Sequence, residues 1–221
     1  MNKYKGIIFD LDGVIVDTAK FHYLAWRKLA NDMGFDITLE QNEQLKGVSR
    51  IHSLERILGW GGKSVSEDKF ETLMASKNED YLARISGMSA EDLLPGVKKV
   101  LDYLYENKIP FALGSASKNA RPILKGLGIS EWFTAIVDGN DVHKAKPDPE
   151  VFLVAAEKLA LKPEECVVFE DSVAGIEAAN RAGMLSVGIG DKEVLKGADY
   201  IFADFTEIDL EFIKKLLESK K

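Results

Sequence analysis

Two aspartates near the start of the chain, Asp10 and Asp12, directly follow the short apolar run Ile7–Phe9. An apolar run after Gly6 indicates a buried strand, and the Asp-Gly pair indicates where it ends. Side chains two residues apart on extended backbone point to the same side, so both carboxylates are expected to face one site. One carboxylate could attack a phosphoryl group while the other protonates the leaving oxygen. The alternative is a strand followed by a solvated turn.

A second acidic pair, Glu170 and Asp171, follows the apolar run Val167–Phe169. Ligands bind outside the carboxyl ends of parallel strands, so acids from two strand ends can converge on one cation. Mg²⁺ prefers one or two carboxylates together with substrate oxygens. We expect Asp171 to be the stronger Mg²⁺ ligand and Glu170 to contribute directly or through water. The alternative for Asp171 is a helix N-cap.

A loop of small residues follows the apolar run Phe111–Leu113 and precedes a helix predicted over 119–127. Backbone N–H groups and a hydroxyl at a helix N-terminus would form an anion site. The loop consists of Gly114, Ser115, Ala116, Ser117, Lys118 and Asn119. The alternative is an N-capping serine loop without a ligand.

Lys146 lies in the sequence Lys-Pro-Asp-Pro, just before another predicted helix. Two prolines restrict the backbone and could aim the ammonium group at a phosphate and at the Asp10 carboxylate. An exposed, solvated lysine is the commoner case in proteins and is the alternative here.

The elements that must position these residues alternate along most of the chain. Apolar runs at 7–9, 111–114, 135–137, 167–169, 186–189 and 200–202 predict strands, and helices are predicted between them. Such alternation indicates right-handed βαβ units. The predicted fold class is therefore α/β, with a Rossmann-like, mainly parallel sheet as its core.

Residues 18–92 interrupt this alternation with helical patterns at 20–33, 39–45, 50–58 and 66–85 and no strand pattern. We therefore predict an inserted all-helical cap domain over 18–92 and an α/β catalytic core formed by 1–17 and 93–221. Hinges are expected at residues 17–18 and 93–96, because hinges are a few residues at the ends of elements. The alternative is an extra helical layer fixed to the core.

The run Phe9–Val14 resembles the first motif of the haloacid dehalogenase superfamily of aspartate-nucleophile phosphotransferases. Three later segments resemble its second, third and fourth motifs, and they contain Ser115, Lys146 and the Glu170–Asp171 pair. The resemblance covers essentially the whole chain. It implies that Ser115 and Lys146 bind the phosphoryl group that is transferred.

The same resemblance implies the roles of the first acidic pair and of the metal ligands. Asp10 would be the nucleophile and Asp12 the general acid and base. Mg²⁺ would be held by Asp10, the backbone carbonyl of Asp12, Glu170 and Asp171.

Within the predicted cap, the loop at 46–50 resembles the cap loop of the β-phosphoglucomutase subfamily, in which this loop binds the phosphate that is not transferred. Its residues are Lys46, Gly47, Val48, Ser49 and Arg50, and four further residues occupy matching positions: His22, Trp26, Ser53 and Lys77. An arginine can hold phosphate through two parallel hydrogen bonds, which a lysine cannot reproduce. Singly, each of these residues also has an ordinary structural interpretation.

The resemblance therefore implies a mutase that interconverts β-glucose 1-phosphate and glucose 6-phosphate through an aspartyl phosphate. β-Glucose 1,6-bisphosphate would be both intermediate and activator. One alternative is a Mg²⁺-dependent sugar-phosphate phosphatase with the same core. Another is a phosphosugar-binding sensor without activity, against which the intact motif residues argue.

Composition limits the partners. A net charge of -7 and a pI near 5.2 argue against general binding to nucleic acid or an anionic membrane. No apolar run approaches the ~20 residues of a membrane helix, and the single cysteine, Cys166, excludes an intramolecular disulfide. We expect a cytoplasmic monomer that acts on a small phosphosugar.

Overall fold

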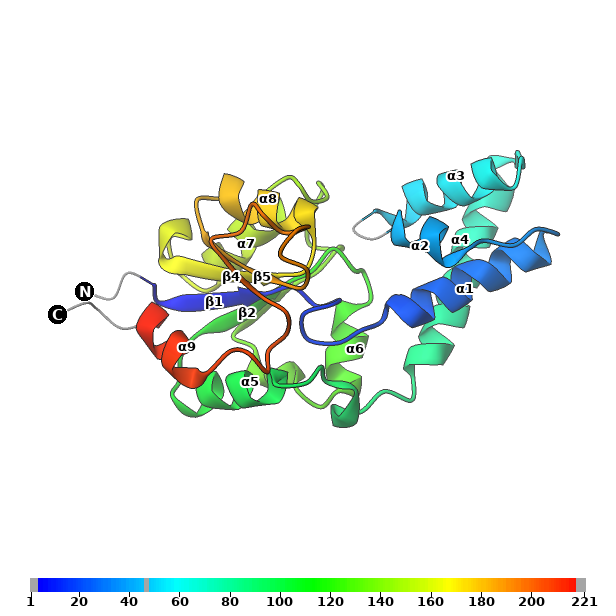
Figure 1. Cartoon of the computed structure of the whole chain (residues 1–221). Helices are drawn as coiled ribbons and strands as arrows, with labels where there is room; N and C mark the ends of the chain where they lie inside the picture. Colours follow the sequence, from blue (N-terminus) through cyan, green and yellow to red (C-terminus); the bar gives the residue numbers. More distant parts are fainter. Residues whose placement is uncertain (1–3, 46–47, 218–221) are drawn as a thin grey trace. The chain divides into compact units, whose positions relative to one another are not determined.

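The structure is a computed structural model that describes residues 4–45 and 48–217. Its ribbon is drawn in Figure 1. The chain forms two compact units, of which the first combines Met1–Asp17 with Met88–Lys221 and the second is Thr18–Gly87. The domain limits predicted from the sequence, including the boundary after residue 92, stay predictions.

The first unit is built on a six-stranded sheet in the order β3-β2-β1-β4-β5-β6. All of the strand pairs described are parallel. The strands are β1 (Gly6–Phe9), β2 (Phe111–Gly114), β3 (Ala135–Val137), β4 (Cys166–Glu170), β5 (Leu185–Ile189) and β6 (Tyr200–Phe202). The α/β fold with a parallel sheet is thereby confirmed.

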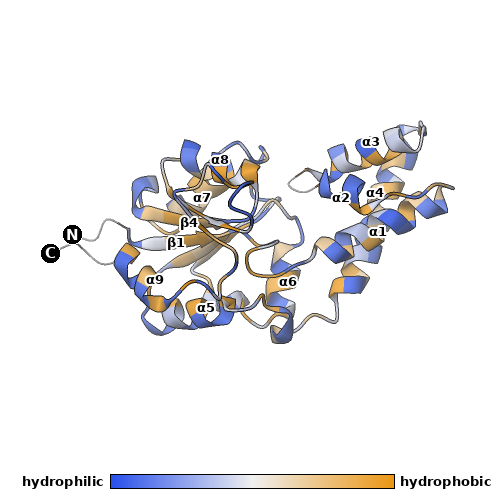
Figure 2. Ribbon diagram, viewed as in Figure 1, coloured by the Kyte–Doolittle hydropathy of each residue, from blue (hydrophilic) through white to orange (hydrophobic). Residues whose placement is uncertain are grey.

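Helices cover both faces of this sheet. They are α5 (Val97–Glu106), α6 (Ala120–Gly126), α7 (Glu150–Lys158), α8 (Val173–Arg181) and α9 (Leu210–Leu217). Ile8 and Val168 pack in one buried cluster with residues of α7 and α8, whereas the Phe9 ring stacks on Phe169 and contacts Phe205. Alternate residues of one strand thus serve two cores, which explains the continuous apolar runs. In Figure 2 the central strands carry mainly hydrophobic colours.

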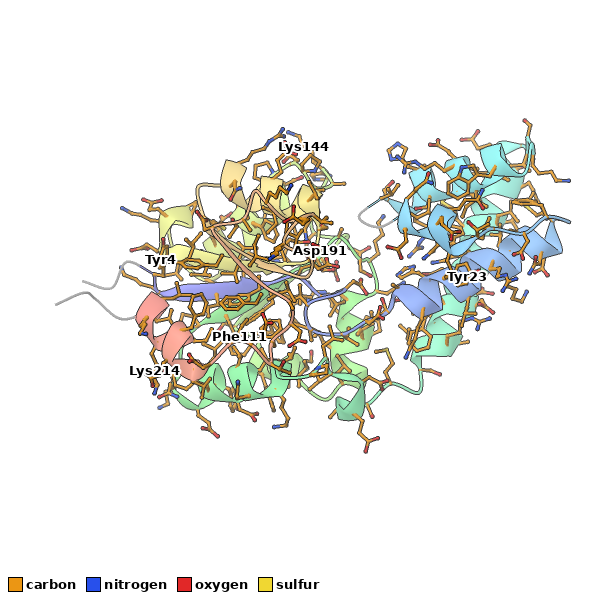
Figure 3. All side chains as sticks on the ribbon, viewed as in Figure 1. Tyr4, Tyr23, Phe111, Lys144, Asp191 and Lys214 are labelled. Atoms are coloured by element: carbon orange, nitrogen blue, oxygen red, sulfur yellow. The ribbon has the colours of Figure 1, made fainter. Side chains whose placement is uncertain are left out.

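The second unit contains α1 (Ala19–Asp32), α2 (Leu39–Glu43), α3 (Arg50–Trp60) and α4 (Glu67–Ile85), and no strand in its described residues, 18–45 and 48–87. Its core includes Trp26, Leu54 and Ile57. Tyr23 projects from α1, as Figure 3 shows, and its hydroxyl donates to the Ile37 carbonyl at 3.3 Å. The all-helical character of this insert is as predicted.

The buried face of α1 does not include every apolar residue of the helix. Leu24 is 42% exposed. The buried residues are instead Ala25, Trp26, Leu29 and Ala30. These residues recur at intervals of three and four, so they lie on one face of the helix. That face includes the Trp26 indole, the largest apolar side chain of α1.

The segment after β1, residues 11–16, forms a tight turn. It pairs with Leu93, which lies where the chain re-enters the first unit after the helical insert. The amides of Ile15 and Val16 donate to the Leu11 carbonyl. Val16 in turn forms an antiparallel bridge with Leu93. The predicted hinge at 17–18 therefore directly follows this bridge, and the predicted hinge at 93–96 begins with it. In the described part of the chain, none of the helices has the length and apolar character needed to span a membrane.

Candidate active site

Three strands end side by side at the site. β1 lies between β2 and β4, with Phe9 in register with Leu113 on one side and Phe169 on the other. The Asp10 amide donates to the Phe169 carbonyl at 2.9 Å, which continues the pairing one residue past the strand. The sheet therefore brings Asp10, Ser115 and Glu170 to one edge, as the sequence predicted for carboxyl ends of parallel strands.

Lys146 reaches the same edge from the loop before α7. Its Nζ lies 2.6 Å from Asp10 Oδ1 and 2.7 Å from Glu170 Oε2. The residue is 8% exposed, and the Phe152 ring centroid lies 4.7 Å from the ammonium. Lys146 is thus a buried cation between two carboxylates, whereas the exposed Lys144, labelled in Figure 3, takes no part.

Three carboxylates form a compact acidic cluster. Asp10, Glu170 and Asp171 each offer an oxygen, and these oxygens lie within 4.8 Å of one another. Two glycines leave room for them, because a Cβ on Gly13 would overlap the Asp171 carboxylate and a Cβ on Gly175 would overlap that of Glu170. Such a set of hard oxygen donors fits Mg²⁺. The structure thus groups three of the four predicted metal-binding residues.

The cluster carries more negative charge than Lys146 can balance. Burial raises the pKa of Asp10 to about 7, against the opposing charge of Lys146. Burial and the charges of Glu170 and Asp10 raise the pKa of Asp171 to about 8. Burial alone would lower the pKa of Lys146, but its two carboxylate partners raise it above its ordinary value. A bound cation would favour the ionised form of Asp10 and Asp171.

The predicted anion loop lies at the end of β2. Ser115 is 1% exposed, and its Oγ accepts from the Ser117 amide at 3.1 Å. The Ser117 Oγ accepts from the Asn119 amide at 3.2 Å. Helix α6 begins at Ala120, one residue later than predicted, after the N-cap Asn119. Ala116 and Lys118 are exposed between these hydroxyls.

Asp12 has different surroundings from Asp10. It is partly buried, and its backbone forms a parallel bridge with Val16. Its carboxylate is not a member of the acidic cluster found among the described residues, although its charge contributes to the raised pKa of both Asp10 and Asp171. Its predicted acid-base role, and a metal bond from its carbonyl, stay predictions.

In the second unit, the structure brings together residues of α1 and α4. Lys77 is 3% exposed, and its Nζ lies 2.8 Å from His22 Nδ1. The ammonium also lies 4.5 Å from the Trp26 ring centroid and 4.8 Å from that of Tyr81. Both aromatic faces attract the cation. Tyr81 has no part in the group predicted from the sequence, although its position four residues after Lys77, on the same helix face, was a signal that the two side chains could meet.

Arg50 and Ser53 belong to the start of α3. Burial lowers the pKa of Arg50, against the charge of Tyr81. Burial, followed by the charges of Lys77 and Arg50, holds the pKa of His22 well below its ordinary value. His22 is therefore neutral, and its Nδ1 accepts from Lys77.

The loop before α3 is described only in part. Ser49 is the N-cap, and its Oγ accepts from the His52 amide at 3.3 Å. Val48 is partly buried. Lys46 and Gly47, both predicted to bind substrate, lie outside the described residues. Ser53, one turn into the helix, is 3% exposed.

Comparisons with known proteins agree with the motifs. A family model for haloacid dehalogenase-like hydrolases matches residues 4–183. A β-phosphoglucomutase of Bacillus subtilis (strain 168) is 44% identical over 212 residues, which cover 95% of this chain and 93% of the relative. The 2.27 Å crystal structure of a β-phosphoglucomutase from Clostridium difficile matches with a TM-score of 0.91 at 44% identity, over 97% of each chain.

A more distant relative has a different activity in its name. A phosphorylated carbohydrates phosphatase of Thermotoga maritima is 31% identical over 182 residues, which cover 81% of this chain and 82% of the relative. The chain is therefore similar to mutases over nearly its whole length and to a phosphatase over most of it.

Proposed function

The chain belongs to the haloacid dehalogenase-like hydrolase family, and from this premise we propose that it is a mutase that interconverts β-glucose 1-phosphate and glucose 6-phosphate. The similarity to two β-phosphoglucomutases supports this choice. The observation that carries it is the cationic group in the second unit, where Lys77 is buried beside His22.

In the proposed reaction, Asp10 attacks the phosphoryl group of a bisphosphate and becomes an aspartyl phosphate. Lys146, 2.6 Å from Asp10, holds the carboxylate in place and offers positive charge to the incoming phosphoryl oxygens. Ser115 and the amides of its loop bind the same oxygens. Mg²⁺, when bound by Asp10, Glu170, Asp171 and the Asp12 carbonyl, would neutralise charge on both carboxylate and phosphate.

Asp12 supplies the proton transfers in this proposal. A sugar hydroxyl is a poor leaving group and must gain a proton as its bond to phosphorus breaks. The accepting hydroxyl must lose one when it attacks the aspartyl phosphate. One carboxyl group that is not committed to the acidic cluster can serve both steps, and Asp12 is such a group.

The second unit would bind the phosphate that is not transferred. Arg50 can hold it by two parallel hydrogen bonds, and Lys77 adds a second cation. A sugar bisphosphate has two phosphoryl groups. In this proposal one binds the residues around Asp10, and the other binds Arg50 and Lys77. After the bisphosphate turns around, the other phosphoryl group can return to Asp10, which yields the isomerised sugar phosphate.

The second candidate is a sugar-phosphate phosphatase, which the relative from Thermotoga maritima favours. In that case water attacks the aspartyl phosphate. The two are separated by incubating the protein with β-glucose 1-phosphate, Mg²⁺ and a trace of β-glucose 1,6-bisphosphate, while glucose 6-phosphate and free phosphate are measured together. Isomerisation without release of phosphate supports the mutase, and release of phosphate alone would overturn it.

A further inference from the structure

A turn after β3 lies against the anion loop, residues 114–119, and contacts its residues 116–118. The amide of Ser115 donates to the Val137 carbonyl at 3.0 Å, which continues the parallel pairing of β2 and β3 beyond their ends. The chain after Val137 is Asp138-Gly139-Asn140-Asp141, here called the β3 turn. None of these residues has a part in the reaction proposed above.

The β3 turn holds the carbonyl groups of the anion loop. The Gly139 amide donates to the Ser117 carbonyl at 3.2 Å. The Asn140 Nδ2 donates to the Lys118 carbonyl at 3.0 Å. The Ala116 carbonyl faces Gly139 so closely that a Cβ there would overlap its oxygen. Three successive carbonyls of the loop therefore face the turn.

This arrangement fixes the direction of the amides. In a planar trans peptide the N–H points opposite to the C=O of the same unit. The amides of residues 117, 118 and 119 therefore point away from the β3 turn. The amides of Ser117 and Asn119 donate to the hydroxyls of Ser115 and Ser117 within the loop, so these two amides also hold the hydroxyls in place. Successive amides that point the same way are an anion-binding arrangement.

The turn is itself held by buried charge. Asp138 is fully buried, and its Oδ1 accepts from the Asn140 amide at 2.8 Å and from the Asn140 Nδ2 at 3.0 Å. Arg121 lies 3.1 Å from Asp138 Oδ2 and 2.8 Å from Asp141 Oδ2. Because Arg121 belongs to α6, the ion pairs connect the helix that follows the anion loop to the turn beside it.

We propose that Asn140 and Gly139 are positioning residues that orient the amides of the anion loop toward the transferring phosphoryl group. The inference rests on one part of the proposed function, the binding of the transferring phosphoryl group by the anion loop, and it does not depend on sugar isomerisation. Asn140 acts through the Lys118 carbonyl, and Gly139 acts by leaving the space that the Ala116 carbonyl occupies.

Two variants test this inference by different routes. Asn140→Ala removes the Nδ2 donor to the Lys118 carbonyl and to Asp138 Oδ1, and Gly139→Ala displaces the Ala116 carbonyl without removing a side-chain hydrogen bond. The matched controls are Asn107→Ala, where Nδ2 donates to the Tyr103 carbonyl at 2.8 Å in α5, and Gly59→Ala, where a Cβ would have no neighbour within 4 Å.

The readouts are the inhibition constant for inorganic phosphate and the KM for acetyl phosphate as donor to Asp10, both at saturating Mg²⁺, together with Mg²⁺ affinity and melting temperature. Both turn variants should weaken the binding of phosphate and acetyl phosphate about tenfold, which is the effect of losing one hydrogen bond between the loop and the phosphate. Mg²⁺ affinity should stay within about twofold, and the controls should bind phosphate like the wild type.

Lower melting temperatures with unchanged phosphate binding would assign the turn to folding alone and overturn the inference. Equal losses of Mg²⁺ and phosphate binding would overturn it as well. Neither readout depends on sugar isomerisation. A chain that proved to be a phosphatase would therefore refute the proposed function and leave this inference standing.

Discussion

Asp10 and Asp12 are two residues apart in the chain, yet the structure gives them different partners. Asp10 is buried against Lys146 at 2.6 Å and shares the acidic cluster with Glu170 and Asp171. Asp12 is partly buried on the turn that follows β1. In the proposed reaction, this difference would let Asp10 act as nucleophile while Asp12 moves protons.

Asp12→Ala should separate two activities. Isomerisation of the sugar phosphate should fall by at least about two orders of magnitude, the usual contribution of general acid-base catalysis. Phosphorylation of Asp10 by acetyl phosphate should fall much less, because its leaving group does not need a proton. Parallel assays on the purified variant measure both rates. If both fell equally and Mg²⁺ affinity fell with them, Asp12 would be a metal ligand and not the acid-base group.

Arg50→Lys should damage sugar isomerisation more than it damages phosphorylation by acetyl phosphate. The substitution keeps the charge but loses the two parallel hydrogen bonds that arginine can donate to a second phosphate. Acetyl phosphate has no second phosphate. Steady-state rates with each donor give the comparison. Equal losses with the two donors would show that Arg50 supports folding instead of phosphate binding.

At the scale of elements, the turn after β1 lies beside the acidic cluster. Gly13 has φ +79°, and a Cβ there would overlap the Asp171 carboxylate. Gly34 has φ +87°, and a Cβ on that residue would have no neighbour within 4 Å. The two glycines thus share a left-handed backbone but differ in what surrounds them.

Gly13→Ala should lower Mg²⁺ affinity about tenfold or more, as is typical when a group that positions a ligand is changed. Gly34→Ala should bear a similar backbone cost of about 1–2 kcal/mol and keep the affinity of the wild type. Titration calorimetry with Mg²⁺ measures both. Unchanged affinity in Gly13→Ala would remove Asp171 from the metal site.

The helical unit should respond to acid through His22. Its pKa is held well below 6.5 by burial and by the charges of Lys77 and Arg50, so its stabilising contribution is complete above pH 6.5. Below that pH, His22 is protonated in the unfolded chain but stays neutral in the folded unit. The free energy of unfolding should therefore fall by at most about 1.4 kcal/mol for each pH unit of acidification.

Urea titrations between about pH 7 and pH 5.5, followed by tryptophan fluorescence, measure this slope in the wild type and in His22→Asn. The asparagine keeps an acceptor for Lys77 but cannot titrate, so its stability should vary less with pH. Identical slopes in the two proteins would mean that the pKa of His22 is the same in the folded and unfolded states.

Sequence reasoning succeeded where a local pattern carries the information. The strands end within one residue of their predicted limits, because apolar runs bounded by Asp, Gly and Pro mark buried parallel strands. The convergence of Asp10 and Glu170 followed from the rule for parallel sheets. The burial of Lys146 between them agrees with the motif resemblance, whereas composition alone favoured an exposed lysine.

What the sequence did not reveal depends on contacts between distant residues. The β3 turn against the anion loop joins Asn140 to Lys118, and neither residue type predicts that bond. The same holds for Gly13 beside Asp171, since a glycine in an Asp-Gly turn is ordinarily explained by its φ angle alone. The short 3₁₀ helices, such as Ala90–Asp92, are three residues long and have no periodicity to detect.

At the scale of the whole molecule, we propose that the first unit transfers the phosphoryl group and that the second unit binds the other phosphate. The family and the parallel α/β fold are established, and the similarity to β-phosphoglucomutases extends over both units. In the proposed reaction, the fate of the phosphoryl group on Asp10 would distinguish a mutase from a phosphatase, since a sugar and water would compete for it.

The most direct test is therefore a single-turnover transfer. The protein is labelled with radioactive phosphoryl groups from acetyl phosphate and Mg²⁺, freed of donor, and mixed with β-glucose 1-phosphate, with Asp10→Asn as the control that should take up no label. We predict that the label passes to the sugar as bisphosphate faster than it appears as free phosphate. Label that is released only as free phosphate, at a rate unchanged by the sugar, would contradict the proposed mutase.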